Sequence, residues 1–333
     1  MKLWRLNPSD TQLEDTQIFQ DICDALSDGK LVAIPTETVY GLAADATNGK
    51  ACAGIYEAKG RPSFNPLISH VDSLEAAQTH AFFDDRALKL AEAFWPGPLT
   101  LVLPKRPDVP PVVTAGLDTI AVRVPEHQIA QMFLQACARP VAAPSANRSG
   151  RPSSTTWQAV LEDLDGRIPC VLQGEPSVVG LESTVIDCTT DIPRVLRVGG
   201  VALESLREVI PDMQGPQDDP VHTPRSPGLR HRHYSPAAHV VLVDKAPSIP
   251  PEQKAGYIGM EEVENEPGGH WRLVERVATP EAYAHHLFDF MRRCDAAGVE
   301  TIYCQTVEPT GIGAAIMDRL QRAAKGTAES RRS

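Results

Sequence analysis

The chain has 333 residues, long enough for two average domains, and its 42% hydrophobic and 23% charged residues are typical of a folded protein. The formal net charge of −11 argues against a surface that coats nucleic acid or binds an anionic membrane. Residues 1–8 lack the apolar core of a signal peptide, and no apolar run reaches the roughly 18 residues of a membrane span. We therefore expect a cytoplasmic protein without a membrane partner.

Helices and strands mix without strict alternation up to about residue 200. Apolar periodicity, capping residues and proline or glycine stops predict helices over 12–27, 48–60, 84–95, 126–138 and 154–163. Strands are predicted over 31–34, 67–70, 99–103, 119–124, 141–143, 170–172, 183–187 and 194–198. This order favours an α/β domain with a mixed sheet over residues 12–200.

A proline-rich segment at residues 201–237 follows, and no apolar period survives in it after residue 211. It predicts an extended linker. From residue 238 onward, strands are predicted over 239–243, 256–259, 271–274 and 300–304, and helices over 280–297 and 311–324. We expect a second, smaller α/β domain of the Rossmann-like kind at 238–330.

The seven cysteines lie far apart and form no C-x-x-C pair. Their odd number and irregular spacing do not suggest a disulfide framework or a cysteine zinc site. We therefore expect reduced, buried thiols.

The acidic average hides three segments without Asp or Glu, at 58–71, 127–161 and 220–243. Each of them carries basic residues, so together they can form one pocket for an anion. Common nucleotide signatures are missing, since there is no G-x-x-x-x-G-K-[ST] loop and Gly311-Ile312-Gly313 lacks the third glycine of a dinucleotide fingerprint. A phosphate site must therefore use other segments.

Lys59 and Arg61 stand at a predicted helix end, beside Pro62. They either complement the helix dipole or bind phosphate, for which Lys offers a point charge and Arg a fork of donors. Arg123 lies inside an apolar strand and needs a partner, which is either a structural carboxylate or the carboxylate of a substrate. His70 ends another apolar strand, where a histidine is either a ligand contact or part of the core.

Polar loops supply further candidates. P-T-E-T-V-Y-G-L at 35–42 follows a buried strand and is either a ligand loop or a polar turn. The small residues of A-A-P-S-A-N-R-S-G at 142–150 let the backbone approach a ligand. Ser153 precedes a predicted helix and is either a ligand contact or its cap. The basic segment 226–236 is a solvated loop, a metal site or part of the pocket.

Six motifs occur together in chain order: P-T-E-T-V-Y-G-L (35–42), K-G-R-P-S-F-N-P-L-I-S-H (59–70), W-P-G-P-L-T (95–100), V-R-V-P (122–125), S-A-N-R-S-G (145–150) and S-P-G-L-R-H-R-H-Y (226–234). With them, residues 12–200 resemble the threonylcarbamoyl-AMP synthase family, the YrdC-like enzymes of tRNA modification. Residues 201–330 resemble the linker and extra C-terminal domain of its two-domain members.

The resemblance implies a twisted sheet with a concave basic pocket, over which the linker folds. It implies a nucleotidyltransferase that joins L-threonine, bicarbonate and ATP to threonylcarbamoyl-AMP and pyrophosphate, with Mg²⁺ on the triphosphate. Downstream proteins then transfer the threonylcarbamoyl group to the adenosine at position 37 of tRNA, and tRNA itself is a further candidate partner. Such a reaction needs no covalent protein nucleophile, because alignment and charge neutralisation supply the catalysis.

The resemblance also assigns residues to each substrate, but it assigns no metal ligands. Threonine is expected at Thr38, His70, Arg123, Ala143 and Ser183. ATP is expected at Lys59, Arg61, Asn65, Thr119, Ser145, Asn147, Ser153, Arg197 and Tyr234. Of these, Lys59 and Arg61 are the expected catalytic residues on the phosphates, and Tyr234 is expected to reach the site from the linker as part of a lid.

Two alternatives stay open at this point. An RNA-binding module of the same fold, without synthase activity, would bind double-stranded RNA or tRNA with the basic concavity, although RNA binding does not need the residues on the threonine side. A unit that forms a related carbamoyl-adenylate from another amine or from carbamoyl phosphate is the other alternative. Such units usually belong to larger proteins with zinc-finger and acylphosphatase-like parts, which we do not find here.

Overall fold

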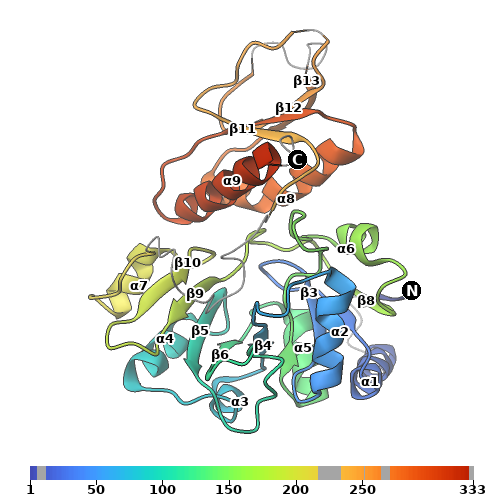
Figure 1. Ribbon diagram of the computed structural model, residues 1–333, viewed down its shortest axis with the longest axis vertical. Coiled ribbons are helices and arrows are strands. Elements are labelled where there is room, and N and C mark those ends of the chain that lie inside the picture. The colour runs from blue at the N-terminus through green and yellow to red at the C-terminus, as the bar shows by residue number, and fades with distance from the viewer. Residues whose placement is uncertain (6–12, 217–233, 251, 264–270, 330–333) are drawn as a thin grey trace.

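The computed structural model describes residues 1–5, 13–216, 234–250, 252–263 and 271–329. These residues form two units, each built on its own sheet (Figure 1). Segment 226–233 of the predicted linker motif lies outside the described residues, with its Arg230 and Arg232.

The first unit is built on a ten-stranded sheet in the order β1-β8-β2-β3-β7-β4-β6-β5-β9-β10, with parallel and antiparallel neighbours. Its strands are β1 (Lys2–Arg5), β2 (Val32–Ile34), β3 (Gly41–Asp45), β4 (Ile68–His70), β5 (Leu99–Pro104), β6 (Thr119–Arg123), β7 (Val141–Ala142), β8 (Cys170–Gln173), β9 (Thr184–Asp187) and β10 (Arg194–Arg197). The prediction of a mixed sheet is confirmed.

Two layers of helices cover this sheet, because successive residues of a strand point to opposite faces. In β2, Ala33 joins one apolar cluster, whereas Val32 and Ile34 join the other. The helices are α1 (Leu13–Ser27), α2 (Gly49–Lys59), α3 (Leu74–Gln78), α4 (Asp85–Phe94), α5 (Gln128–Cys137), α6 (Trp157–Leu164) and α7 (Leu203–Val209). Helices α1 and α5 pack on the side of Val32, and α2 and α4 pack on the other side.

Local signals explain most of these boundaries. The Asn48 side chain accepts hydrogen bonds from the first backbone N–H groups of α2, and Gly60 ends that helix with a left-handed φ of 61°. The short elements β1, β3 and α3 were not predicted. Elements β1 and α7 lie outside the predicted 12–200 range, yet β1 pairs with β8, and Leu206 of α7 joins the core on the α2 side of the sheet. Helix α7 thus occupies the start of the segment predicted as linker.

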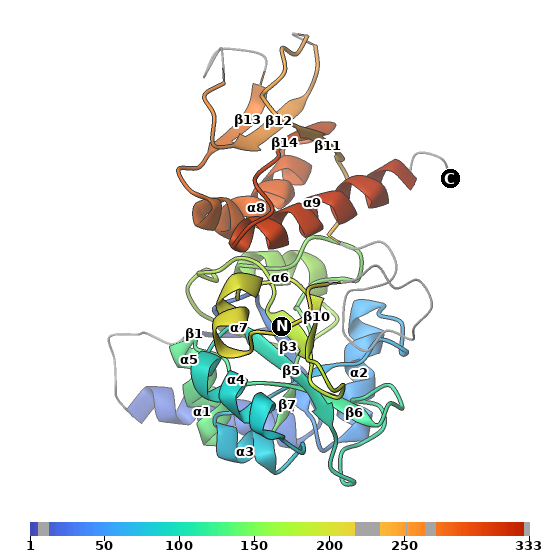
Figure 2. The ribbon, with the colours of Figure 1, turned by 90° about the vertical axis from the view of Figure 1, so that its left-hand side faces the viewer.

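The second unit holds a four-stranded parallel sheet in the order β11-β14-β12-β13, as expected for a Rossmann-like domain. Its elements are β11 (His239–Val243), β12 (Ala255–Gly259), β13 (Trp271–Arg276), α8 (Pro280–Ala296), β14 (Thr301–Gln305) and α9 (Ile312–Glu329). Helices α8 and α9 lie between this sheet and the first unit (Figures 1 and 2). The prediction of a smaller α/β domain after the mixed-sheet domain is confirmed.

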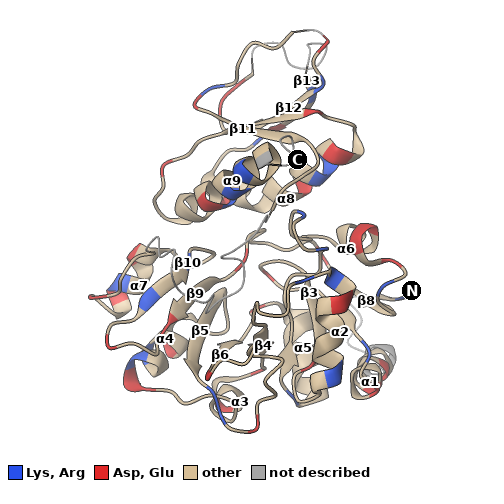
Figure 3. Ribbon diagram, in the orientation of Figure 1, with Lys and Arg blue, Asp and Glu red and all other residues tan. Residues whose placement is uncertain are grey.

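Two buried arginines cross from the second unit to the first. Arg292 of α8 binds Asp163 of α6 at 2.8 Å, and Arg319 of α9 binds Glu182 at 2.8 Å. These side chains are almost completely shielded from solvent, whereas charges of both signs are interspersed along the outer helices and loops (Figure 3).

The expectation of reduced thiols is wrong for two of the seven cysteines, since a disulfide joins Cys23 of α1 to Cys137 of α5. The two helices pack against each other, which brings residues 114 apart in sequence to a Cα separation of 5.2 Å. The other five cysteines are free and buried, as predicted. Within the described ranges, no helix combines the length and the apolar character that a membrane crossing needs.

Candidate active site

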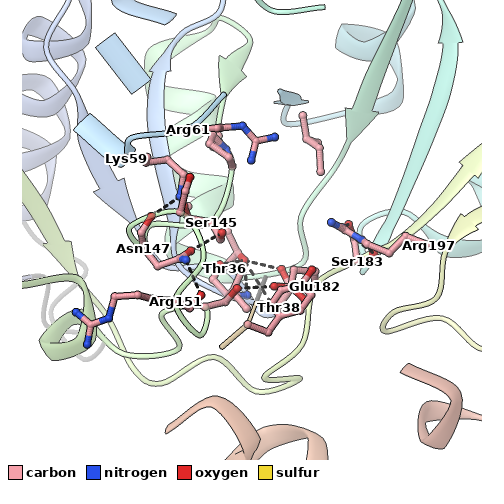
Figure 4. A pocket seen from close by; sticks show the side chains of 18 of the residues that line it. Thr36, Thr38, Lys59, Arg61, Ser145, Asn147, Arg151, Glu182, Ser183 and Arg197 are labelled. Atoms are coloured by element: carbon pink, nitrogen blue, oxygen red, sulfur yellow. Dashed lines mark hydrogen bonds between the residues drawn. The ribbon is translucent and has the colours of Figure 1, made fainter. Parts of the chain in front are cut away.

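A cavity lies among loops and strand ends of the first unit (Figure 4), and its wall residues Tyr234 and Glu182 contact Phe288 of α8 and Arg319 of α9 in the second unit. Its walls come from residues within the segments 36–41, 59–61, 68–70 and 143–153, although the buried Glu37 is not one of them, together with Arg123, Glu182, Ser183, Arg197 and Tyr234. All residues predicted for threonine and ATP line this cavity, except Asn65 and Thr119. The fold therefore gathers the separate sequence motifs in one place.

Lys59 ends α2 and ties that helix to the loop after β7. Its ammonium group donates to the backbone carbonyls of Ser145 and Asn147. The Ser145 hydroxyl donates in turn to the Asn147 side-chain carbonyl at 2.6 Å, and the Asn147 amide donates to the Arg151 carbonyl at 2.9 Å. Burial lowers the pKa of Lys59 well below its usual value, so its charge depends on what else enters the cavity.

Arg61 projects its guanidinium into the cavity from just beyond α2 (Figure 4). Its Nε and Nη2 atoms donate to the Asn65 carbonyl at 3.3 Å, and Nη2 also donates to the Pro66 carbonyl at 3.0 Å. Burial lowers the pKa of Arg61 to about 10, which leaves it protonated at neutral pH. A fixed cation thus faces the cavity, oriented by the loop that follows it.

Asn65 and Thr119 lie outside the cavity wall. Asn65 is buried, and its carbonyl accepts from Tyr56 and Arg61, so its backbone supports the wall from behind. Thr119 begins β6, about 13 Å along the strand from Arg123, which faces the cavity from the other end. Their predicted contacts with ATP stay predictions.

Arg123 and His70 are register partners on the neighbouring strands β6 and β4. Arg123 donates to the Thr38 hydroxyl at 2.8 Å and to the Gly97 carbonyl at 3.2 Å. Its Nη2 atom also lies 2.6 Å from a carboxylate oxygen of Glu37. Of the two partners that the sequence left open for Arg123, the structural carboxylate is present and is Glu37. Arg123 nevertheless lines the cavity.

The charge state of this end of the cavity follows from burial. Desolvation opposes ionisation of Glu37, but Arg123 outweighs it and holds the Glu37 pKa below its usual value. Burial, reinforced by Arg123, lowers the pKa of His70 to about 3, so its imidazole is neutral at physiological pH. Arg123 and Glu37 thus form a buried ion pair beside a neutral histidine.

Close backbone contacts fix the remaining wall. A Cβ at Gly41 would lie 3.2 Å from the Cβ of Ala143, so the close approach of these chains favours glycine there. Ser183 shares a hydrogen bond of 2.8 Å with Thr100, and its hydroxyl accepts from Arg197 at 3.1 Å. Arg197 and Arg61 stand on opposite sides of the cavity (Figure 4).

Three further groups at the cavity were not assigned a role from the sequence. Glu182 lines the wall and accepts a hydrogen bond from the Ser153 hydroxyl. Thr36 lies at 2.9 Å from the Thr38 hydroxyl. Arg151 forms an ion pair with Asp163, and its side chain points away from the labelled groups around the cavity (Figure 4). Glu182 directly precedes the strand predicted over 183–187, and this position was the available signal, since a carboxylate that is buried beside a strand needs a partner.

Tyr234 is the described end of the predicted lid motif. It is 5% exposed, lines the cavity, and stacks on Phe288 of α8 with ring centroids 5.4 Å apart. The contact joins the cavity to the core of the second unit.

The donor set does not fit a protein-bound metal. Among the described residues, no group of three or more His, Cys, Asp and Glu side chains is placed to hold one. Within the described part of the chain, Glu182 is the one carboxylate that lines the cavity, and Arg319 and Ser153 occupy its oxygens. The described residues are therefore built to bind anions rather than a cation.

Comparison with known proteins decides the family. A family model described as "Telomere recombination" matches residues 24–199, and one described as "Threonylcarbamoyl-AMP synthase, C-terminal domain" matches residues 201–325. A threonylcarbamoyl-AMP synthase of Pyrococcus abyssi is 43% identical over 90% of this chain and 91% of its own. This chain belongs to the threonylcarbamoyl-AMP synthase family.

Other members support the same conclusion over the full length. The threonylcarbamoyl-AMP synthase of Bacillus subtilis is 40% identical, and the match covers 98% of both chains. The crystal structure of P. abyssi Sua5 complexed with L-threonine superposes with a TM-score of 0.88 at 39% identity, over 98% of this chain and 97% of the other. The resemblance drawn from the six motifs is confirmed.

Proposed function

We propose that this member of the threonylcarbamoyl-AMP synthase family joins L-threonine, bicarbonate and ATP in the cavity, and releases threonylcarbamoyl-AMP, pyrophosphate and water. The observation that carries the proposal is the convergence of four basic side chains, Lys59, Arg61, Arg123 and Arg197, on one cavity of an otherwise acidic protein. A site of this kind suits a ligand with several negative charges.

Threonine is assigned to the end of the cavity around His70 and Arg123. The Arg123 guanidinium suits the amino-acid carboxylate, and its contacts with Glu37 and Thr38 fix its orientation before the ligand arrives. The neutral imidazole of His70 offers a hydrogen bond without a second positive charge. Ala143 and Ser183 complete this side as small wall residues.

ATP is assigned to the end of the cavity around Lys59 and Arg61. These two cations would neutralise the phosphates, and Arg197 would approach from the opposite wall (Figure 4). Ser145, Asn147 and Ser153 supply neutral polar side chains, and Tyr234 supplies an aromatic face beside the second unit. The two substrates would then meet between Arg61 and Arg123.

The chemistry follows from this alignment. The threonine amine forms an N–C bond to the carbon of bicarbonate, and water leaves to give a carbamate. A carbamate oxygen then attacks the α-phosphorus of ATP, so that a new O–P bond forms as the bond to pyrophosphate breaks. Lys59 and Arg61 would stabilise the charge that develops on the leaving pyrophosphate, and no protein nucleophile is required.

Mg²⁺, the later partners and the location in the cell belong to the same proposal. Because the described residues do not fit a metal centre, a Mg²⁺ ion would be carried by the triphosphate and water. Threonylcarbamoyl-AMP is an activated acyl donor, which fits transfer by downstream proteins to the adenosine at position 37 of tRNA, in the cytoplasm. The test is pyrophosphate release by the purified protein, which should require threonine and bicarbonate together with ATP.

A further inference from the structure

Glu182 has an unfavourable position for an enzyme that binds a triphosphate. Among the described residues that line the cavity it is the one carboxylate, and it is 7% exposed. An ionised, unpaired carboxylate there would repel an anionic ligand, and its own burial would be costly. Whatever neutralises Glu182 therefore contributes to ATP binding.

The group that neutralises Glu182 comes from the second unit. The Nε atom of Arg319, on α9, lies 2.8 Å from one carboxylate oxygen, and the Ser153 hydroxyl donates to the other. Arg319 also donates to the Val198 carbonyl at 2.9 Å and pairs with Asp318. Its guanidinium lies 5.1 Å from the ring centroid of Tyr234. With 0% of the side chain exposed, Arg319 is held on every side.

Glu182 and Arg319 depend on each other for their charges. Desolvation opposes ionisation of Glu182, but Arg319 and Arg197 overcome it and lower the Glu182 pKa. Desolvation likewise opposes the charge of Arg319, but Tyr234 and the carboxylates of Glu182 and Asp318 outweigh it and raise the Arg319 pKa. Removal of Arg319 would therefore leave a buried carboxylate beside the cavity without its main partner.

Apolar packing also connects the second unit to the cavity wall around Glu182. The core of the second unit extends onto Val39 and Leu181 of the first unit. Val39 directly follows the cavity residue Thr38, and Leu181 directly precedes the cavity residue Glu182. Arg292 of α8 adds a hydrogen bond to the carbonyl of Pro152, next to Ser153. The second unit thus contacts the chain on both sides of the hydrogen bond between Ser153 and Glu182.

We propose that Arg319 is a positioning residue of the ATP site: the second unit neutralises Glu182 through Arg319 and thereby orients Ser153 and permits a triphosphate to bind. Arg319 acts through Glu182, since it is not one of the residues that line the cavity. The inference rests on the proposed placement of ATP in this cavity. It gives the second unit a direct part in substrate binding.

The test uses the full chain and measures ATP affinity by calorimetry, together with KM and kcat in the pyrophosphate assay. Arg319→Gln should raise the Kd and KM for ATP roughly tenfold or more, with a smaller effect on the KM for threonine. The double variant Glu182→Gln/Arg319→Gln should regain most of the lost ATP affinity, because the unpaired charge is then gone. Arg322→Gln is the matched control, since Arg322 also pairs with Asp318 from the same helix.

The outcomes separate positioning from a merely structural role. If the double variant binds ATP no better than Arg319→Gln, or if Arg319→Gln equals Arg322→Gln, the inference is overturned. Arg319→Lys keeps the positive charge and provides a second test should Arg319→Gln fail to fold: its Kd for ATP should stay within about threefold of wild type, and a tenfold loss would contradict the inference. A wild-type protein that fails to bind ATP would overturn the proposed function as well.

Discussion

Replacement of Arg61 can distinguish a side chain that binds phosphate from one that only supports the fold. We expect Arg61→Ala to fold and to lose nearly all synthase activity. The folded state keeps most of its support, because the hydrogen bonds of Arg61 within the described residues go to the carbonyls of Asn65 and Pro66, and two of these three bonds are long, at 3.3 Å.

The magnitudes follow from those contacts. Loss of weak bonds from a partly exposed side chain should lower the free energy of unfolding by about 1–2 kcal/mol, a small part of the roughly 5–15 kcal/mol of a typical domain. Loss of a fixed cation that stabilises charge in the transition state costs about 3–4 kcal/mol, or roughly 10²–10³ in rate. The loss of activity should therefore far exceed the loss of stability.

The assay is threonine-dependent pyrophosphate release, with urea unfolding of the same preparations. Arg167→Ala is a suitable control, because exposed Arg167 contacts the carbonyl of Ala58 near the end of the same helix without lining the cavity. Arg167→Ala should retain wild-type activity. If Arg61→Ala retains more than about a tenth of the activity, the phosphate role of Arg61 is refuted.

Three further predictions concern buried groups. Arg123→Gln should lower the free energy of unfolding in urea by about 3–5 kcal/mol, because it leaves Glu37 buried without its partner, and a loss below about 1 kcal/mol would contradict the ion pair. Burial lowers the pKa of Lys59 and bound phosphates should raise it again, so between these two pKa values ATP binding should take up a proton and weaken as the pH rises; calorimetry over a pH series in buffers of different ionisation enthalpy measures this, and proton release would refute it. Thiol titration of the unreduced, denatured protein should find five free thiols, whereas seven would exclude the bond between Cys23 and Cys137.

The parts of the fold with strong local signals were predictable from the sequence. Asn48 and Gly60 mark both ends of α2, and the short apolar runs at β2 and β5 coincide with buried strands. The missed strands have weak local patterns: β1 depends on its partner β8, and β3 (Gly41–Asp45) begins within the motif at 35–42, which was interpreted as a ligand loop or a polar turn. Their pairing is set by tertiary contacts, which one-dimensional periodicity does not contain.

The site shows the same division. The resemblance carried by the ordered motifs predicted Lys59, Arg61 and Arg123 around one pocket, and all three line the cavity. The buried ion pair of Arg319 with Glu182 was not predictable, because an arginine within a long amphipathic helix is normally exposed. Its burial arises only when α9 packs against the loops around Glu182, a contact between residues 137 apart in sequence. The disulfide between Cys23 and Cys137 was missed for a similar reason, since it depends on how α1 and α5 pack.

Pyrophosphate release by the purified protein tests whether it joins threonine, bicarbonate and ATP. Purified protein is incubated with ATP, Mg²⁺, L-threonine and bicarbonate, and pyrophosphate is measured with each component omitted in turn. The account predicts that release requires threonine and bicarbonate together with ATP, and that threonylcarbamoyl-AMP forms in equal amount. Pyrophosphate release that continues at the same rate without threonine would contradict it.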